Sequence, residues 1–292
     1  MTVITLIHNP RAGIQPIAAP ILMSLLSRAG YQAHYVSVRR TANLAADLLR
    51  RRGLVVVAGG DGTVADVLRA GRNARLQVAI LPSGVANNIA SSFGISDALP
   101  AAVTDWRRSR PRPTHLAMLE VAGKQWLVVE SIGLGALADA ARTMPHRTTS
   151  SFARTGMLAQ TRRHFRDVIA QAPRMTRLAI DGEEVGHRPI FAEILNIPMT
   201  GPNLRLTREA TLSDGHLHIV YASEKHRQPL LDWLDNGAAP AAVPALPTLR
   251  AKAFAVDWEG GTLRIDDEMT NRSGGRLTVR CDRARISVLA PP

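Results

Sequence analysis

Leu54-Val-Val-Val-Ala-Gly-Gly-Asp-Gly-Thr63 decides the fold of this chain. Its first five residues are all apolar, which is typical of a strand buried on both faces of a parallel sheet. The glycines that follow allow a tight turn, and the apolar spacing from Thr63 to Ala70 predicts a helix directly after that turn. A buried strand that runs through a glycine turn into a helix is the unit from which parallel α/β sheets are built.

The same unit recurs on both sides of this segment. Further strands are predicted at Val3 to His8, His34 to Val38 and Gln77 to Leu81, and helices at Pro16 to Ala29, Thr41 to Arg52 and Val85 to Ser92. Repeated strand–helix units with short connections form a parallel sheet that is wound in both directions. We therefore predict an N-terminal doubly wound α/β domain over residues 1–113.

The pattern changes after about residue 110. The arginine- and proline-rich segment from Arg107 to Pro113 resembles a linker. From Leu116 onward most segments are strand-like, and turns such as Asp181-Gly182 join them as hairpins. A helical segment is predicted near 150–171. The fold class is therefore α/β plus β, with a C-terminal antiparallel β-sandwich domain over residues 114–292.

Composition agrees with two globular domains. The chain has 292 residues, of which 46% are hydrophobic and 21% charged, and that length fits two domains of ordinary size. No apolar run approaches the roughly 18 to 20 residues that a membrane-spanning helix needs. The start lacks the features of a secretory signal, and Cys281 is the single cysteine. These features lead us to expect a protein of the reducing cytoplasm.

The formal net charge is +12, which favours polyanionic partners. Aromatic residues make up only 4% of the chain and no nucleic-acid-binding motif is present, so nucleic acid is not expected. Between Asp139 and Asp167 there is no acidic residue, while arginines alternate with apolar residues. This segment predicts either a solvated helix face or a basic amphipathic helix that binds the anionic inner face of the membrane peripherally.

Three loops follow predicted strands of the first half: Asn9 to Gly13, Gly59 to Thr63 and Pro82 to Asn88. In a parallel sheet all three leave the carboxyl edge, where such sheets bind ligands. Each loop enters a helix N-terminus, which favours an anion, and Asp61 adds the carboxylate that a magnesium-bound nucleotide needs. The alternative is three ordinary tight turns. No Walker-type phosphate loop is present.

The motifs resemble the catalytic-domain family of diacylglycerol kinases, which sphingosine kinases, ceramide kinases and bacterial lipid kinases share. The likeness extends from the three loops to Asp214-Gly215 and Ile265-Asp-Asp-Glu268 in the second half. It implies an NAD kinase/diacylglycerol kinase-like fold in which ATP and a lipid meet between the domains. The implied activity is the ATP- and Mg²⁺-dependent phosphorylation of a lipid hydroxyl, with diacylglycerol as the default acceptor.

Matching the family motifs residue by residue assigns each implied role to a position in this chain. The residues implied in ATP binding are Asn9, Gly13, Ser37, Gly59, Gly60, Asp61, Gly62, Thr63, Gly84 and Asn87. Asp61 would also bind Mg²⁺, and Asp214 would hold a second, structural Mg²⁺. Asp266 would be the base that accepts the proton of the lipid hydroxyl, with Glu268 orienting it or the metal.

The chain departs from the family pattern at four positions. Val85 stands where a threonine is usual, Asn88 where an aspartate is common, Asp267 at the glycine of Asp-Gly-Glu, and Ser213 at the acid before Asp214. The departures at Val85, Asn88 and Asp267 keep open a non-catalytic sensor of nucleotide or lipid. A second alternative is an NAD kinase-like enzyme, because NAD kinases share the Gly-Gly-Asp-Gly-Thr loop and the broad architecture. A homodimer is also left open.

Overall fold

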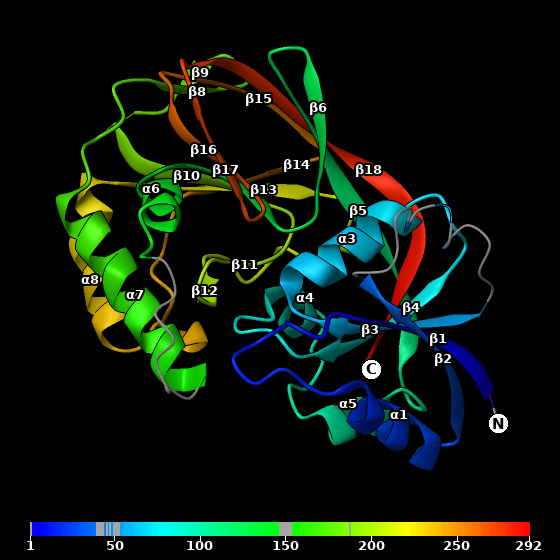
Figure 1. Ribbon diagram of the computed structural model, residues 1–292. Coiled ribbons are helices and arrows are strands. Elements are labelled where there is room, and N and C mark those ends of the chain that lie inside the picture. Colours follow the sequence, from blue (N-terminus) through cyan, green and yellow to red (C-terminus); the bar gives the residue numbers. More distant parts are fainter. Residues whose placement is uncertain are drawn as a thin grey trace. The chain divides into compact units, whose positions relative to one another are not determined.

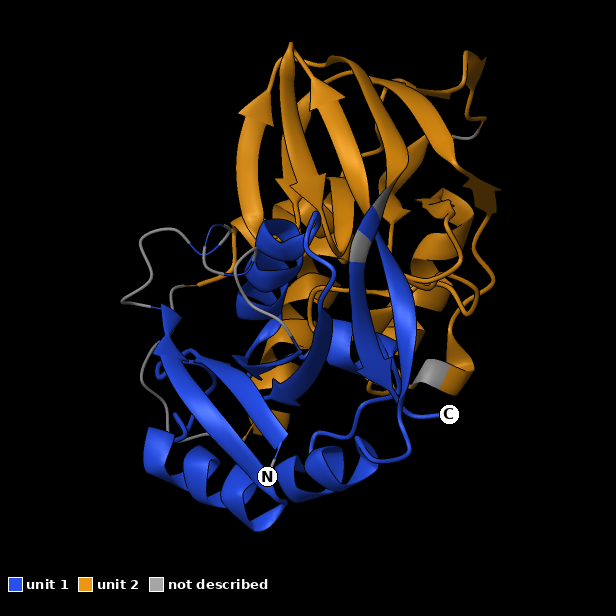
Figure 2. Cartoon of the chain, turned by 90° about the vertical axis from the view of Figure 1, so that its right-hand side faces the viewer, with its two compact units in different colours: residues 1–115, 283–292 blue, residues 116–282 orange. Residues whose placement is uncertain are grey.

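The computed structural model describes residues 2–38, 44, 46, 48, 53–145, 154–186 and 188–292. Most of the helix predicted from Thr41 to Arg52 lies outside these residues, as does the start of the predicted basic segment. The contacts divide the chain into unit 1, Met1–His115 with Arg283–Pro292, and unit 2, Leu116–Asp282 (Figure 2). The division into an ATP-binding domain, 1–113, and a β-rich lipid-substrate domain, 114–292, stays a prediction.

Unit 1 is built on a parallel sheet. Its strands are β1 (Thr2–His8), β2 (Tyr31–Ser37), β3 (Leu54–Gly59) and β4 (Gln77–Pro82), in the order β2-β1-β3-β4. The last part of β18 (Gly275–Ala290) pairs parallel with β4 through Ser287 and Val288. The interior of β3 is fully buried, as its apolar sequence predicts.

The helices of unit 1 are α1 (Ala19–Arg28), α3 (Asp61–Gly71), α4 (Asn88–Ser92) and α5 (Leu99–Asp105). Figure 1 shows α1 and α5 on one face of the sheet and α3 on the other. Tyr31, just after α1, packs edge to face on Trp106, just after α5. The prediction of a doubly wound α/β unit is therefore confirmed.

Unit 2 contains a six-stranded antiparallel sheet in the order β14-β13-β10-β7-β16-β17. The bounds are β7 (Ser131–Gly135), β10 (Pro189–Leu195), β13 (Leu217–Ser223), β14 (Thr248–Ala251), β16 (Gly261–Ile265) and β17 (Glu268–Arg272). A second group of strands comprises β5 (Arg110–Val121), β6 (Lys124–Val128), β8 (Leu178–Ile180), β9 (Glu183–Glu184), β15 (Ala253–Trp258) and the first part of β18.

One core of unit 2 lies between these two sets of strands and includes Leu119, Ile132, Ile194 and Val256. A β-sandwich results, as the sequence predicts. A second core includes Phe165, Phe191 and Leu230. It joins the six-stranded sheet to α6 (Ala136–Arg142), α7 (Arg154–Gln171) and α8 (Arg227–Asp235), which lie side by side in Figure 1.

The remaining elements of unit 2 are short. They are β11 (Met199–Thr200), β12 (Leu204–Arg205), and the 3-10 turns η2 (Glu224–His226) and η3 (Pro240–Ala242). β11 and β12 pair with each other. Within the described parts of the chain, no helix combines the length and the apolar character needed to cross a bilayer.

Candidate functional site

Glycines bring the three loops of unit 1 into backbone contact. A Cβ atom at Gly84 would lie 2.5 Å from the Cα atom of Gly60, and one at Gly13 would overlap the carbonyl oxygen of Ser83. The loops after β1, β3 and β4 therefore touch one another without side chains between them. Glycine loops at helix N-termini are able to bring their backbone amides close to a phosphate group.

Asn9 connects the first loop with the second. Its backbone N–H donates to the carbonyl of Ala58 at 2.9 Å, and its side-chain Nδ2 donates to Thr63 Oγ1 at 2.9 Å. Thr63 lies in the first turn of α3 and is buried. The asparagine predicted from the sequence therefore fixes the end of β1 against the start of α3.

Asn87 has a similar function in the third loop. It adopts the left-handed conformation with φ 55° directly before α4, a conformation that asparagine tolerates better than most residues. Its Oδ1 accepts the N–H of Gly84 at 2.9 Å, and its Nδ2 donates to Asp97 Oδ1 at 3.2 Å. The side chain is 3% exposed, so its hydrogen bonds are part of the loop's own structure.

Asp61 is the first residue of α3, where the helix dipole favours a negative charge. Its Oδ1 accepts the backbone N–H of Ile89 at 2.9 Å and so connects α3 to α4. Ser37 ends β2 and is the register partner of His8, at the same edge of the sheet. The nucleotide-binding residues predicted from the sequence therefore gather at the carboxyl ends of β1 to β4.

These residues fit a nucleotide bound with a divalent cation. The glycine contacts bring the three loops together, and Asp61 offers one carboxylate in the second loop. Magnesium is commonly held by one or two carboxylates together with the phosphates of the substrate. Over the described ranges there is no cluster of three or more ligating side chains.

Asp266 forms the turn between β16 and β17 in unit 2. It has a left-handed backbone with φ 52°, which costs an L-residue roughly 1–2 kcal/mol. Its carboxylate accepts three successive backbone N–H groups, from Val129 at 3.0 Å, Glu130 at 2.7 Å and Ser131 at 3.1 Å. These hydrogen bonds hold the side chain in one orientation, and the residue is only 4% exposed.

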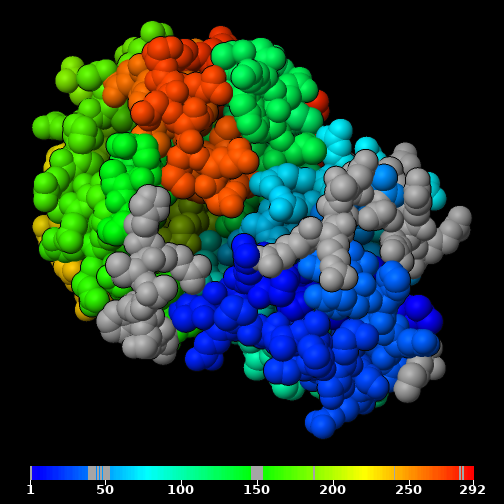
Figure 3. All heavy atoms as spheres, viewed as in Figure 1, coloured from blue at the N-terminus to red at the C-terminus, as the bar shows by residue number. Residues whose placement is uncertain are grey.

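The other residues of this turn are exposed. Asp267 and Glu268 both face solvent, and the hairpin forms part of the surface drawn orange in Figure 3. Asp267 stands at the family's glycine position, yet among the described residues the positive φ of this turn belongs to Asp266. The loss of that glycine therefore imposes no backbone strain on the turn.

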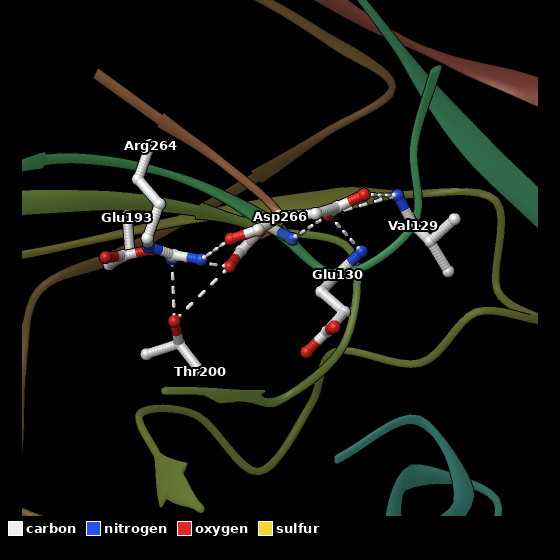
Figure 4. Close-up of polar contacts among 7 residues, drawn as sticks. Val129, Glu130, Glu193, Thr200, Arg264 and Asp266 are labelled. Carbon is white, nitrogen blue, oxygen red and sulfur yellow. Dashed lines mark hydrogen bonds and ion pairs between the residues drawn. The ribbon is translucent and has the colours of Figure 1, made fainter. Parts of the chain in front are cut away.

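A buried ion pair beside Asp266 was not predicted from the sequence. Arg264 Nη2 lies 2.7 Å from Glu193 Oε2, and both residues are buried (Figure 4). Burial raises the pKa of Glu193 above its ordinary value, and the Arg264 guanidinium offsets part of that rise. The available signal was Gly133, because a glycine inside a strand often marks a place where other groups approach the backbone closely.

The surroundings of Asp214 do not fit a metal ion. Its Oδ2 lies 3.7 Å from Arg250 Nη2 and 3.6 Å from His218 Nε2. Its Oδ1 accepts the backbone N–H of His216 at 2.9 Å, and its carbonyl oxygen lies 2.8 Å from His216 Nδ1. Mg²⁺ requires oxygen ligands, whereas a guanidinium, the His218 imidazole and a backbone N–H surround this carboxylate, so no step below depends on a metal here.

Comparisons with known proteins agree with this arrangement. Residues 3–119, which include all three loops, match the family model described as "Diacylglycerol kinase catalytic domain". This segment therefore resembles a diacylglycerol kinase catalytic domain. The resemblance to the diacylglycerol kinase catalytic-domain family, which we predicted from the motifs, is therefore confirmed. The prediction of a kinase-type phosphotransferase is confirmed as well.

Relatives extend the likeness beyond that domain. The diacylglycerol kinases of Mycobacterium tuberculosis strains CDC 1551 / Oshkosh and H37Rv are each 27% identical over 239 residues, covering 77% of this chain and 73% of the relative. A solved diacylglycerol kinase structure from Bacillus anthracis str. Sterne has 16% identity and a TM-score of 0.71 over 99% of this chain and 97% of the other. A second structure from that organism has a TM-score of 0.72. The fold of the diacylglycerol kinases therefore spans both units.

Proposed function

We propose that this protein is an ATP-dependent lipid kinase that transfers the γ-phosphate to a lipid hydroxyl, with diacylglycerol as the default acceptor. The single observation that carries the proposal is the backbone contact of three glycine loops within a segment that matches a diacylglycerol kinase catalytic domain. Phosphoryl transfer depends mainly on positioning and charge neutralisation, and these loops are suited to both.

In this proposal the loop residues bind the phosphates. Bound ATP with Mg²⁺ would supply the transferable group and neutralise its charge. Gly59 to Thr63 and Gly84 present backbone amides, while Asn9, Asn87 and Ser37 contribute polar side chains near the same edge. Asp61 holds the cation. The support is the gathering of these residues at the carboxyl ends of the strands.

Asp266 is the proposed base that accepts the proton of the lipid hydroxyl. A base within hydrogen-bond reach of the reacting group typically contributes about 10²–10⁴-fold to the rate. The support is the fixed orientation of its carboxylate, which three backbone amides hold. Glu268, two residues further along the exposed side of the turn, is proposed to orient the acceptor or the metal.

We place the enzyme in the cytoplasm, bound peripherally to an anionic membrane that contains its substrate. The net charge of +12 supports this location. The described arginines of the basic segment differ in their availability, however. Arg162 donates to the carbonyl of Pro202, and Arg166 pairs with Asp235, whereas Arg163 is exposed. The membrane contact is therefore assigned to Arg163 and its exposed neighbours.

A lipid-panel assay with labelled ATP tests the activity. Mixed micelles would contain diacylglycerol, a sphingoid base, ceramide or another glycerolipid, and NAD would replace lipid in a parallel reaction. We expect a phospholipid product that Asp61→Asn and Asp266→Asn each reduce by at least about a hundredfold. Melting curves of both variants provide the control for folding.

The same assay separates the competing hypotheses. Phosphorylation of NAD without any lipid product would favour the NAD kinase-like enzyme. Binding of ATP without turnover on any lipid would favour the sensor. Full activity of Asp266→Asn would exclude Asp266 as the base while leaving the kinase assignment intact.

A further inference from the structure

Three neighbouring strands place the buried ion pair beside Asp266. Glu193 on β10 and Arg264 on β16 are both register partners of Gly133 on β7. Residues directly opposite each other in antiparallel strands share a face of the sheet, so the two side chains meet over the glycine. A Cβ atom at Gly133 would lie 2.5 Å from Glu193 Oε1 and 3.1 Å from Arg264 Nε. Glycine therefore leaves the room that the pair occupies.

Arg264 contacts both parts of the structure that hold Asp266. Its Nη1 donates to the carbonyl oxygen of Asp266 at 2.6 Å, and its Nη2 donates to Ser131 Oγ at 2.8 Å (Figure 4). Ser131 in turn donates its backbone N–H to Asp266 Oδ1 at 3.1 Å and accepts the N–H of Asp266 at 2.9 Å. One guanidinium thus connects the hairpin with the segment that binds its carboxylate.

Stability alone does not explain this ion pair. Glu193 is 0% exposed and Arg264 is 6% exposed, and within the described residues Glu193 Oε1 has no hydrogen-bond partner. Desolvation offsets much of the attraction in such pairs, and apolar residues of similar volume often stabilise a core equally well. The left-handed Asp266, by contrast, needs surroundings that enforce its conformation, and Arg264 contacts its carbonyl directly.

We infer that Arg264, held in place by Glu193, is a positioning residue that sets the orientation of the Asp266 carboxylate for phosphoryl transfer. The inference rests on the proposed function for the role of Asp266. Arg264 acts through the main chain of Asp266 and through Ser131. Without it, the turn and the amides of residues 129–131 lose their common anchor, so the carboxylate moves away from the acceptor hydroxyl. A displacement of about 1 Å can cost about a hundredfold in rate.

The test compares Arg264→Met, Arg264→Lys and the double variant Glu193→Leu with Arg264→Met. We expect Arg264→Met to lower kcat about a hundredfold, with KM for ATP and lipid within about threefold of wild type. The double variant restores the melting temperature, because no unpaired charge remains, but its kcat stays low. Lysine keeps one donor and recovers part of kcat.

Arg227 supplies a matched control. It pairs with Glu224 at 2.8 Å and donates to the carbonyl of Ala172 at 2.8 Å, so it also bridges a glutamate and the main chain, on an element remote in sequence from the hairpin. Arg227→Met should lower the melting temperature and leave kcat unchanged. Hydrogen exchange of the amides of Glu130 and Ser131 supplies a readout that does not need activity. We expect faster exchange in Arg264→Met and in the double variant.

Two results would overturn the inference. One is a double variant that regains kcat together with its melting temperature, and the other is wild-type protection of both amides in Arg264→Met. A wild-type protein that makes no phospholipid would instead refute the proposed function. In that case the exchange data still decide whether Arg264 holds Asp266 in place.

Discussion

Gly84 has no side chain because its backbone touches the backbone of another loop. A Cβ atom there would lie 2.5 Å from Gly60 Cα, and 2.8 Å from Asn87 Oδ1. Neither neighbour is the end of a long flexible side chain, so the loops themselves must move apart. The amides that are proposed to bind phosphate move with them.

Replacing Gly84 with alanine should therefore weaken nucleotide binding. We expect Gly84→Ala to raise KM for ATP about tenfold, equivalent to about 1.4 kcal/mol, and to destabilise the fold by about 1–3 kcal/mol, as is typical of overpacking. Gly186→Ala is the control, because no heavy atom lies within 4 Å of its added Cβ. Steady-state kinetics and melting curves provide the measurement, and an unchanged KM in Gly84→Ala would contradict the role of this contact.

The environment of Asp214 predicts insensitivity to divalent cations at that position. Arg250, the His218 imidazole and the backbone N–H of His216 surround the carboxylate, and a ligand that binds the native state raises its stability. We therefore measure how much the melting temperature of the nucleotide-free protein shifts when a chelator is replaced by excess Mg²⁺. This shift should be the same in wild type and in Asp214→Asn. A Mg²⁺-dependent gain that disappears in Asp214→Asn would show that the carboxylate binds the cation after all.

At this scale the sequence predicts residue types better than it predicts their partners. Asn9, Asn87 and Asp61 could be singled out because they lie in loops that follow predicted strands and match the family's motifs. The pairing of Glu193 with Arg264 could not, because 71 residues separate them and only the strand register places both beside Gly133. The same holds for Arg250 on β14, which lies close to Asp214 because β14 pairs with β13, the strand that follows Asp214.

At the scale of elements, β7, β10 and β16 enclose a carboxyl group whose pKa is raised. Burial is the main cause, and Arg264 opposes it. A raised pKa in the folded state means that this state binds the proton more tightly than the unfolded chain does. The stabilisation that Glu193 contributes is therefore fully present below its unfolded value, near 4.5, and is lost as pH rises through the folded pKa.

This sign leads to a measurable difference between wild type and Glu193→Gln. The free energy of unfolding of wild type, relative to the variant, should fall as pH rises from about 4 to 8, by about 1.4 kcal/mol for each unit by which the pKa is raised. Glu224→Gln is the control of opposite sign, because the hydrogen bond from Arg227 lowers the pKa of Glu224. Denaturant unfolding at several pH values gives both slopes. If the free energy of unfolding of wild type, relative to Glu193→Gln, instead rose with pH, the effect of Arg264 on the pKa of Glu193 would outweigh that of burial.

The strands of unit 1 could be predicted because each is a short apolar run that ends in turn residues. Helix α7 corresponds to the helical segment that the sequence predicts near 150–171. Helix α8 is not predicted from the sequence, although its buried residues Leu230, Leu231, Trp233 and Leu234 recur at helical spacing. Its position depends on packing against α7 and the six-stranded sheet, which no local pattern in the sequence encodes.

For the whole chain, the sequence predicts an α/β part and a β-rich part, but it does not predict to which of the two the C-terminal residues belong. Residues 283–292 belong to unit 1, because the last part of β18 pairs with β4. That pairing joins strands about 200 residues apart in the chain. An apolar alternation identifies β18 as a strand, yet it cannot say which edge of which sheet the strand extends.

The net charge of +12 is the property of the whole molecule that bears on its partner. Exposed arginines near an anionic membrane contribute about 1 kcal/mol each, and salt screens this attraction. Wild type should therefore sediment with vesicles that contain anionic lipid, and less so at high salt or with neutral vesicles. Arg163→Glu removes one positive charge and adds a negative one, so we expect affinity to fall about tenfold or more. Arg75→Glu makes the same charge change at an exposed position in unit 1 and should weaken binding less. Equal losses in both variants would mean that net charge, and not α7, determines membrane binding.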